Sequence, residues 1–205
     1  MKKALLFLFI ILAGIAASAQ TNLDSLFSVW QDESQPDSIR VDAYSTYVRS
    51  GFAFSNPDSA FVLAEALITY GKKNDYDRGR ALGLKLQGII KYVQSDFPKA
   101  LEFSHRSLKV FESIGDKTEM SNMLNNISAF HQAQGNYKEA EVFSSQSLLI
   151  RKELGDKRGI SMSLTILGVI CSNQGNYPKA LDYYTTSLKI AEEINDRDQI
   201  SINVH

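Results

Sequence analysis

The chain of 205 residues is 44% hydrophobic, which is enough apolar material for a folded core and excludes the class of intrinsically disordered proteins. Its formal net charge of -1 lacks the basic excess with which nucleic-acid-binding proteins neutralise phosphates, so no nucleic-acid partner is expected. The single cysteine, Cys171, cannot form an internal disulfide, so packing must hold the fold together, and Cys171 is expected to be a small buried residue.

The first nineteen residues have the layout of a secretory signal peptide. Lys2 and Lys3 form a short positive start, residues 4–16 are an uninterrupted apolar and small-residue stretch, and residues 17–19 are the small residues that a signal peptidase reads. The apolar stretch is shorter than the roughly 20 residues of a bilayer-spanning helix, which disfavours the alternative of a retained membrane anchor. We therefore expect a mature chain that begins at Gln20 and is exported to the periplasm or cell surface of a bacterium.

The mature chain is expected to begin with a capping segment. Between residues 22 and 31, Leu23, Leu26, Phe27 and Trp30 recur at the spacing that places them on one face of a helix. The terminal units of a repeat array need a cap, so residues 20–36 are expected to cover the open end of the first repeat.

From residue 37 onward the sequence repeats with a period of forty residues. The segment GNYKEA at 135–140 recurs as GNYPKA at 175–180, with looser copies at 95–100 and 55–60. Two further markers, a Gly-Asp-Lys turn and a Ser-Leu pair, keep the same phase. The shared phase predicts repeats at about 37–76, 77–116, 117–156 and 157–196, followed by a partial unit at 197–205.

Each repeat contains two helix-length stretches separated by turn residues. Within 117–134, apolar residues recur at helical spacing, and the stretch ends before Gly135, a residue type suited to the left-handed end of a helix. Asn136 and Asp156 are expected to cap the helices that follow them through their side-chain oxygens. The expected helices are 38–50, 57–72, 77–94, 97–113, 117–134, 137–153, 157–174 and 177–193.

Residues of the same type recur at equivalent helix positions. The first helices carry small residues for close helix approach, and the second helices carry an aromatic residue at their start and an alanine three residues later. These markers are Gly88, Ser128 and Gly168; Phe97, Tyr137 and Tyr177; and Ala60, Ala100, Ala140 and Ala180. With them, residues 38–205 resemble the tetratricopeptide repeat family in its variant of about forty residues. The resemblance implies an all-α fold, an α-α superhelix of antiparallel helix pairs whose first helices line a concave groove.

The sequence also departs from the family pattern. Leu84, Leu124 and Leu164 stand where the family has a tryptophan in the first helix. Gln87 and Lys91 fall at positions where the phase expects core residues.

The groove-facing side of the first helices is the candidate binding site; it is polar and uncharged in the 117–134 helix and more apolar in the preceding repeat. Asparagine and glutamine carry both donors and acceptors and can bond the backbone of an extended peptide. Related repeats use groove asparagines in this way, which points to Asn125 and Asn126. The face comprises Asn122, Asn125, Asn126, Ala129, Gln132 and Ala133 in one repeat, Thr165, Ser172 and Asn173 in the next, and Lys85, Ile89 and Tyr92 in the preceding one. The alternative is that these side chains are only solvated.

No catalytic or metal-binding constellation is found in the sequence. His105, His131 and His205 fall in different repeats without Glu or Cys at ligand spacing, and His131 is expected to pack between helices. The glycine-containing segment at 155–159 resembles a phosphate loop, but its recurrence at 115–117 identifies a turn between helices. Glu192 and Glu193 are expected in solvent, and Phe103, Phe143 and Tyr183 form an expected core stripe. We therefore expect no enzyme activity, cofactor, metal or small-molecule substrate.

Two functions of different class remain open. The first is an exported, non-catalytic scaffold that binds a protein or peptide in the groove. The second is the extracytoplasmic sensory region of a longer membrane signalling protein, such as a sensor histidine kinase or nucleotide cyclase. Residues 198–205 begin another first helix without a partner, which favours a longer chain, and membrane contact is expected only if the chain continues past His205.

Overall fold

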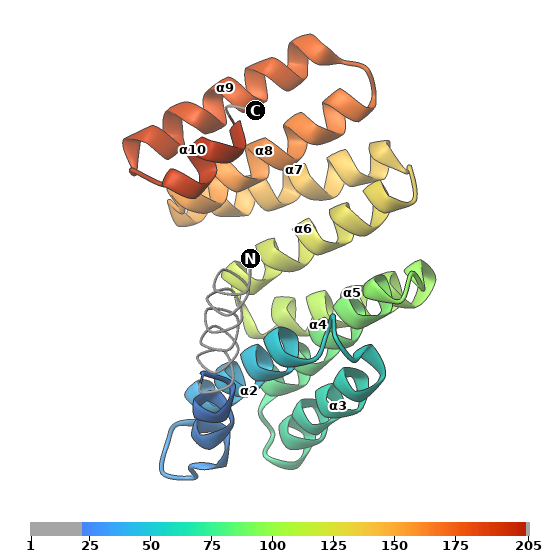
Figure 1. Cartoon of the computed structure of the whole chain (residues 1–205), viewed down its shortest axis with the longest axis vertical. Helices are drawn as coiled ribbons and strands as arrows, with labels where there is room; N and C mark the ends of the chain where they lie inside the picture. Colours follow the sequence, from blue (N-terminus) through green and yellow to red (C-terminus); the bar gives the residue numbers. More distant parts are fainter. Residues whose placement is uncertain (1–21, 204–205) are drawn as a thin grey trace, which may run out of the picture. The chain divides into compact units, whose positions relative to one another are not determined.

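The computed structural model describes residues 22–203, apart from the side chains of Arg197, Ile200 and Asn203 (Figure 1). The expected signal peptide lies outside the described residues, as does His205. Every regular element within 22–203 is a helix, so the chain has the all-α architecture expected. A helix at 22–31 is followed by α2 (Asp37–Gly51), α3 (Pro57–Lys73), α4 (Asp77–Val93), α5 (Phe97–Ile114), α6 (Lys117–Ala133), α7 (Tyr137–Leu154), α8 (Lys157–Asn173), α9 (Tyr177–Glu193) and α10 (Arg197–Asn203).

The helix bounds expected from hydrophobic spacing and turn residues are confirmed to within one residue at each end. Four helices begin forty residues apart, at Asp77, Lys117, Lys157 and Arg197. Across residues 22–203, none of the helices has the length and apolar character that crossing a membrane requires.

Left-handed residues and side-chain caps separate the helices. Gly135 and Gly155 have φ values of 76° and 67°, in the region that glycine adopts without strain. Asp156 accepts a hydrogen bond from the backbone N–H of Gly159 at 2.9 Å, which confirms the expected cap of α8. The expected cap by Asn136 is wrong: its side chain makes no cap bond, and its Nδ2 donates to Gln134 Oε1 at 3.0 Å. A local side-chain bond has replaced the bond to the backbone.

The chain divides into two compact units, one ending at Leu86 and the other beginning at Gln87, so the boundary falls inside α4. In the first unit, the helix at 22–31 packs on α2 and α3 through aromatic rings. Trp30 lies 4.5 Å from the ring of Tyr44 and 4.9 Å from the ring of Tyr70. Arg40 stacks over Trp30 and donates to its carbonyl oxygen at 3.0 Å. The apolar face predicted for 22–31 is therefore the face that packs.

In the second unit, α6 pairs with α7 and α8 with α9 as antiparallel neighbours, and α7 also packs on α8 (Figure 1). The small residues predicted at close approaches occupy them. A Cβ added to Gly168 would lie 2.6 Å from the ring of Tyr184, and the Ser128 hydroxyl donates to the Ala140 carbonyl at 2.8 Å. Gln87, which stands at a core position, is buried as that position requires.

Candidate functional site

The residues expected to line the groove in α6 share one helix face. Asn122, Asn125 and Ala129 follow the three- and four-residue spacing of neighbours on a helix surface, and Asn126 and Gln132 flank them. All of them are uncharged. Asn122, Asn126, Ala129 and Gln132 are half-buried, and Ala133 is exposed. The structure therefore brings the asparagine and glutamine amides predicted in this repeat together along one helix.

Asn125 is the most buried member of this face, with 9% of its surface exposed. Its Oδ1 accepts no hydrogen bond from any residue within 22–203. A buried carbonyl oxygen without a donor costs about 1–3 kcal/mol, and most such groups in proteins are satisfied. Because Oδ1 itself has almost no accessible surface, this acceptor is enclosed by the surrounding residues.

Asn122 is oriented by a residue that the sequence analysis missed. Arg151 of α7 donates from Nη2 to Asn122 Oδ1 at 2.8 Å. Its other groups bond Asp156 Oδ2 at 3.0 Å and Ser147 Oγ at 3.4 Å, and its side chain is 7% exposed. The sequence repeat could have revealed Arg151, because the positions forty residues before and after it hold the buried apolar residues Phe111 and Ala191. A charged residue at such a position is an exception to the pattern.

The corresponding face of α8 differs from that of α6 in having an apolar stripe. Met162 and Val169 are 38% and 39% exposed, and Ile166 between them is half-buried. Thr165 is engaged within the protein, because its hydroxyl donates to the Ser161 carbonyl at 3.1 Å. The expected groove residues Ser172 and Asn173 are half-buried and exposed, respectively, near the end of α8. The sequence analysis did not single out the apolar residues of this stripe.

A hydroxyl on α7 contacts both α6 and α8. Ser147 Oγ donates to the Ser121 carbonyl of α6 at 2.8 Å and lies 3.5 Å from Ser163 Oγ of α8. Ser121 precedes Asn122, and Ser163 follows Met162. The α6–α8 face is the set of equivalent positions on these two helices: Asn122, Asn125, Asn126, Ala129, Gln132, Ala133, Met162, Thr165, Ile166, Val169, Ser172 and Asn173.

The two groove residues predicted in α4 have separate surroundings. Lys85 is half-buried in the first unit. Tyr92 belongs to the second unit, where its ring stacks on Phe130 at 4.6 Å and lies 5.9 Å from Phe97. The ring of Tyr92 thus takes part in helix packing.

His131 packs between helices, as expected. Its ring stacks on Phe143 with centroids 5.4 Å apart, and its Nδ1 is buried without a hydrogen-bond partner in the described part of the chain. Burial lowers the pKa of His131, Glu139 opposes this shift and His105 adds to it. The folded surroundings of His131 therefore favour the neutral imidazole over the protonated form.

Replacing His131 by phenylalanine is expected to reduce the loss of stability in weak acid. The unfolded chain has an ordinary histidine pKa near 6.5, above that of the folded chain, so the unfolded state binds more protons between the two values. The free energy of unfolding therefore has its full value above pH 6.5, where His131 is neutral in both states. It decreases as the pH falls through the lower pKa of the folded chain. Urea unfolding at pH 7.5 and pH 5.0 would measure this, and an equal pH dependence in both proteins would contradict it.

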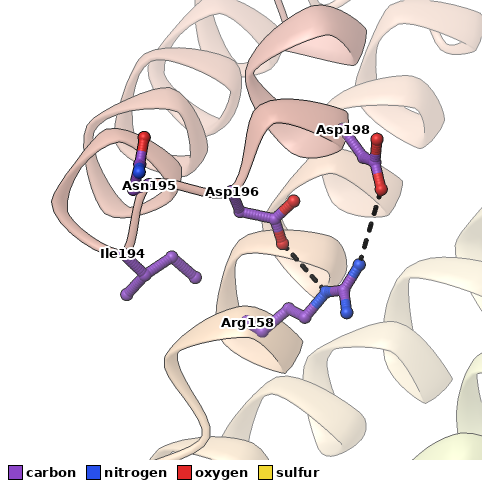
Figure 2. Close-up of a pocket in the computed structure, with 5 residues that line it drawn as sticks. All are labelled: Arg158, Ile194, Asn195, Asp196 and Asp198. Atoms are coloured by element: carbon purple, nitrogen blue, oxygen red, sulfur yellow. Dashed lines mark ion pairs between the residues drawn. The ribbon is translucent and has the colours of Figure 1, made fainter.

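Other titratable groups of the second unit are further candidates for chemistry, beginning with the thiol of Cys171. Cys171 is fully buried, and burial raises the pKa of its thiol. Within residues 22–203, no three His, Cys, Asp or Glu side chains are grouped so that they could hold a metal ion. Figure 2 shows a hollow where Arg158 of α8 points toward Asp196 and Asp198, with Nε 2.8 Å from Asp196 Oδ2. These ion pairs join the first turn of α8 to the turn before α10 and to α10 itself.

The comparison of sequences agrees with this arrangement of helices. The sequence model of the tetratricopeptide repeat family matches residues 119–193. Residues 119–193 carry tetratricopeptide repeats. Among curated proteins, none matches the chain in sequence.

Solved structures with tetratricopeptide-like folds are similar to the chain in fold. Aspartyl phosphate phosphatase F from Bacillus subtilis has a TM-score of 0.76 at 14% identity, with 91% of this chain and 52% of that chain covered. A Rap protein complexed with Competence and Sporulation Factor gives 0.75 at 15%, with 91% and 53% covered. A signal transduction ATPase with a tetratricopeptide repeat sensor, from Pyrococcus horikoshii, gives 0.69 at 16%, with 84% and 28% covered.

The sequence identity between this chain and these three proteins is low. At 14–16% identity they show the fold alone, and the chain spans about half the length of the first two proteins and about a quarter of the third. Tetratricopeptide repeats are interaction modules whose stacked helix pairs present an extended surface to a partner. The general role that the fold supports is therefore that of a protein–protein interaction scaffold.

Proposed function

We propose that this chain is an exported, non-catalytic scaffold that holds a peptide or protein segment against the α6–α8 face. The observation that carries the proposal is the row of uncharged amides on one face of α6, where Asn122, Asn126 and Gln132 are half-buried and reach the surface. Amide groups carry both donors and acceptors, so they can bond the N–H and C=O groups of a polypeptide backbone.

Two further observations support a polypeptide as the partner. One of the solved structures with a similar fold is a Rap protein complexed with Competence and Sporulation Factor. The α6–α8 face also contains no ionisable residue, which disfavours nucleic acid and other phosphate-bearing ligands. A protein or peptide is therefore the proposed partner, and no cofactor is required.

Export is proposed from the signal-peptide pattern of residues 1–19. The test is to express the full chain in a bacterium and to sequence the N-terminus of the protein in each cell fraction. The expected product is periplasmic and begins at Gln20. Recovery of the uncleaved chain in the cytoplasm or the membrane would contradict export.

The mature protein can then be tested for peptide capture. We expect it to retain a subset of an array of random ten-residue peptides that are N-acetylated and C-amidated. The double variant Asn126→Ala/Gln132→Ala is expected to bind these peptides about tenfold more weakly, because each lost hydrogen bond contributes about 0.5–1.5 kcal/mol. The matched control is Asn136→Ala, which removes an exposed asparagine in the turn outside the face. Equal capture by both variants would reject the α6–α8 face as the binding site.

A second candidate function is supported by one of the structural likenesses. The Pyrococcus horikoshii signal transduction ATPase of similar fold uses a tetratricopeptide repeat sensor. The corresponding proposal is that these repeats are the extracytoplasmic sensory region of a longer membrane signalling protein. The coding sequence beyond His205 distinguishes the two: a membrane span followed by a kinase or cyclase region supports the sensor, and a stop codon supports the free scaffold.

A further inference from the structure

The outward side of α7 carries two apolar residues where the neighbouring second helices carry charges. Val142 and Leu149 are 55% and 60% exposed. They are seven residues apart, so they lie on the same side of the helix, two turns from each other. The positions forty residues before and after them hold an acid and a lysine, which are Glu102 with Lys109 in α5 and Asp182 with Lys189 in α9. The outward side of α7 therefore lacks the charges that solvate the corresponding sides of α5 and α9.

The same side of α7 contains a hole of the kind that receives a side chain from a facing helix. It is an open hollow of about 450 Å³ lined by Lys138, Glu141, Val142, Ser145 and Gln146. The first four of these residues have the spacing i, i+3, i+4 and i+7, which is that of the four residues around a hole in interlocked helix pairs. The ion pair of Glu141 with Lys179 of α9, at 2.6 Å, fixes one edge of the hollow. α7 therefore offers a place for one apolar side chain of a partner helix.

The order of residues along this side is complementary to its own reverse. The α7 stripe is the set of exposed residues that follow one another along it: Lys138, Val142, Ser145, Gln146, Leu149 and Glu153. Lys138 lies as far before the midpoint of the stripe as Glu153 lies after it, and Val142 as far before it as Leu149 after it. Two antiparallel copies of α7, related by a two-fold axis at the midpoint, would therefore place lysine against glutamate and valine against leucine. Each contact would occur twice, as in any two-fold interface.

We propose that the α7 stripe is a self-association surface through which two copies of this chain form an antiparallel, two-fold dimer. In this arrangement Leu149 of each copy enters the hollow beside Val142 of the other. Glu153 can take part because only its Oε2 accepts from Lys117, at 2.9 Å, and a carboxylate has a second oxygen for Lys138 of the other copy. A second copy is the partner because the stripe itself supplies both members of every pair.

The size of the surface predicts a weak dimer. α7 has 18 residues and is about 27 Å long, so a contact between two such helices is at the small end of specific interfaces. None of the residues of the α7 stripe belongs to the α6–α8 face, so a dimer would carry two copies of that face. A partner with two binding segments would then be held more strongly than by one copy, since the second binding event is intramolecular. The dimer itself needs no ligand and can be tested without one.

The experiment is sedimentation velocity of the mature protein at concentrations up to about 0.5 mM, which covers weak affinities. The wild-type protein is expected to shift from monomer to dimer as its concentration rises. Leu149→Lys introduces the residue type that α5 and α9 have at this position. It is expected to weaken the dimer more than about tenfold, because an unpaired charge would enter the hollow at two places. Its melting temperature should not change, because Leu149 is largely exposed in the single chain. The matched control is Leu181→Lys, which replaces an exposed leucine of α9 outside the stripe.

Reversal of the charges tests the antiparallel register. Lys138→Glu and Glu153→Lys are each expected to weaken the dimer about fivefold, because two like-charged pairs would replace two attractive ones. The variant with both substitutions exchanges the charges and restores the attraction. Its dissociation constant is expected to lie within about twofold of the wild-type value.

Each result supports or overturns the proposal. A wild-type protein that stays monomeric at every concentration would overturn it. A dimer that survives Leu149→Lys, or one that Leu181→Lys weakens equally, would also overturn it, because either result places the contact outside the α7 stripe. Double charge reversal that brings no recovery would overturn the antiparallel pairing of Lys138 with Glu153.

Discussion

Replacing Asp156 by alanine is expected to destabilise the second unit by about 3 kcal/mol, because its carboxylate both caps α8 and pairs with the buried Arg151. Oδ1 accepts from the Gly159 backbone N–H at 2.9 Å and caps α8, and Oδ2 pairs with Arg151 Nη1 at 3.0 Å. The lost cap accounts for about 1 kcal/mol. The remainder arises because the Arg151 guanidinium, with only 7% of its side chain exposed, is left without its counter-ion.

The repeats provide a matched control for this prediction. Asp116 caps α6 in the same way, accepting from the Glu119 backbone N–H at 3.1 Å, but Phe111 stands where the next repeat has Arg151. Asp116→Ala should therefore cost about 1 kcal/mol, as is typical for the loss of a helix cap, because it leaves no buried arginine behind. Urea unfolding followed by circular dichroism would compare the two variants. Equal losses in the two would show that the Arg151 charge has no energetic importance.

A double variant isolates the charge itself. Asp156→Ala combined with Arg151→Met removes the cap and the cation together, so no unpaired buried charge is left. We expect the double variant to be more stable than Asp156→Ala alone, with a total loss close to that of Asp116→Ala. A double variant less stable than the single one would mean that Arg151 stabilises the fold through its other bonds, to Asn122 and Ser147.

The positions of the helices could be predicted from the sequence because each repeat needs turn residues and small residues at the same places. Turn glycines at Gly135 and Gly155, and small residues such as Ser128 and Gly168 at close approaches, recur in phase with the apolar residues. Each marker alone is weak, but a shared phase fixes the register of every helix. The face of α6 that carries the asparagines could be predicted in the same way, since helix phase determines which residues are neighbours.

Side-chain partners within the site could not be predicted, because phase does not determine where a long or flexible group ends. Arg151 stands at a core position, and its reach to Asn122 and Asp156 depends on the space left by Gly159. The turns around Asn136 and Asn176 show the same limit. Both follow a Gln-Gly pair, yet Asn176 caps its helix by accepting from the Lys179 N–H, whereas Asn136 bonds Gln134. Bonds of similar energy compete there, and the sequence does not decide between them.

Replacing Gly83 by alanine is expected to destabilise the first unit by about 2 kcal/mol, because α3 and α4 approach closely at this residue. A Cβ at Gly83 would lie 2.6 Å from Ile68 Cγ1, 2.8 Å from the Ala64 carbonyl oxygen and 3.0 Å from the Ile68 backbone nitrogen. A backbone atom cannot rotate away as a side-chain end can, so α3 and α4 must separate. Trp30 is the chain's single tryptophan and packs against Tyr44 and Tyr70. Its fluorescence during urea unfolding therefore reports the stability of this unit.

The control is Gly88→Ser, a substitution that a neighbouring repeat already contains. A Cβ at Gly88 would lie 2.6 Å from Ser104 Oγ, a side-chain end that can rotate, and 3.2 Å from the Ala100 carbonyl oxygen. Ser128 occupies the equivalent position and donates to the Ala140 carbonyl at 2.8 Å, so a serine at 88 can form the same bond to Ala100. Because the added hydroxyl gains an acceptor, we expect a change of less than about 0.5 kcal/mol in unfolding followed by circular dichroism. If Gly88→Ser were as damaging as Gly83→Ala, contact with backbone atoms would not be the cause of the loss.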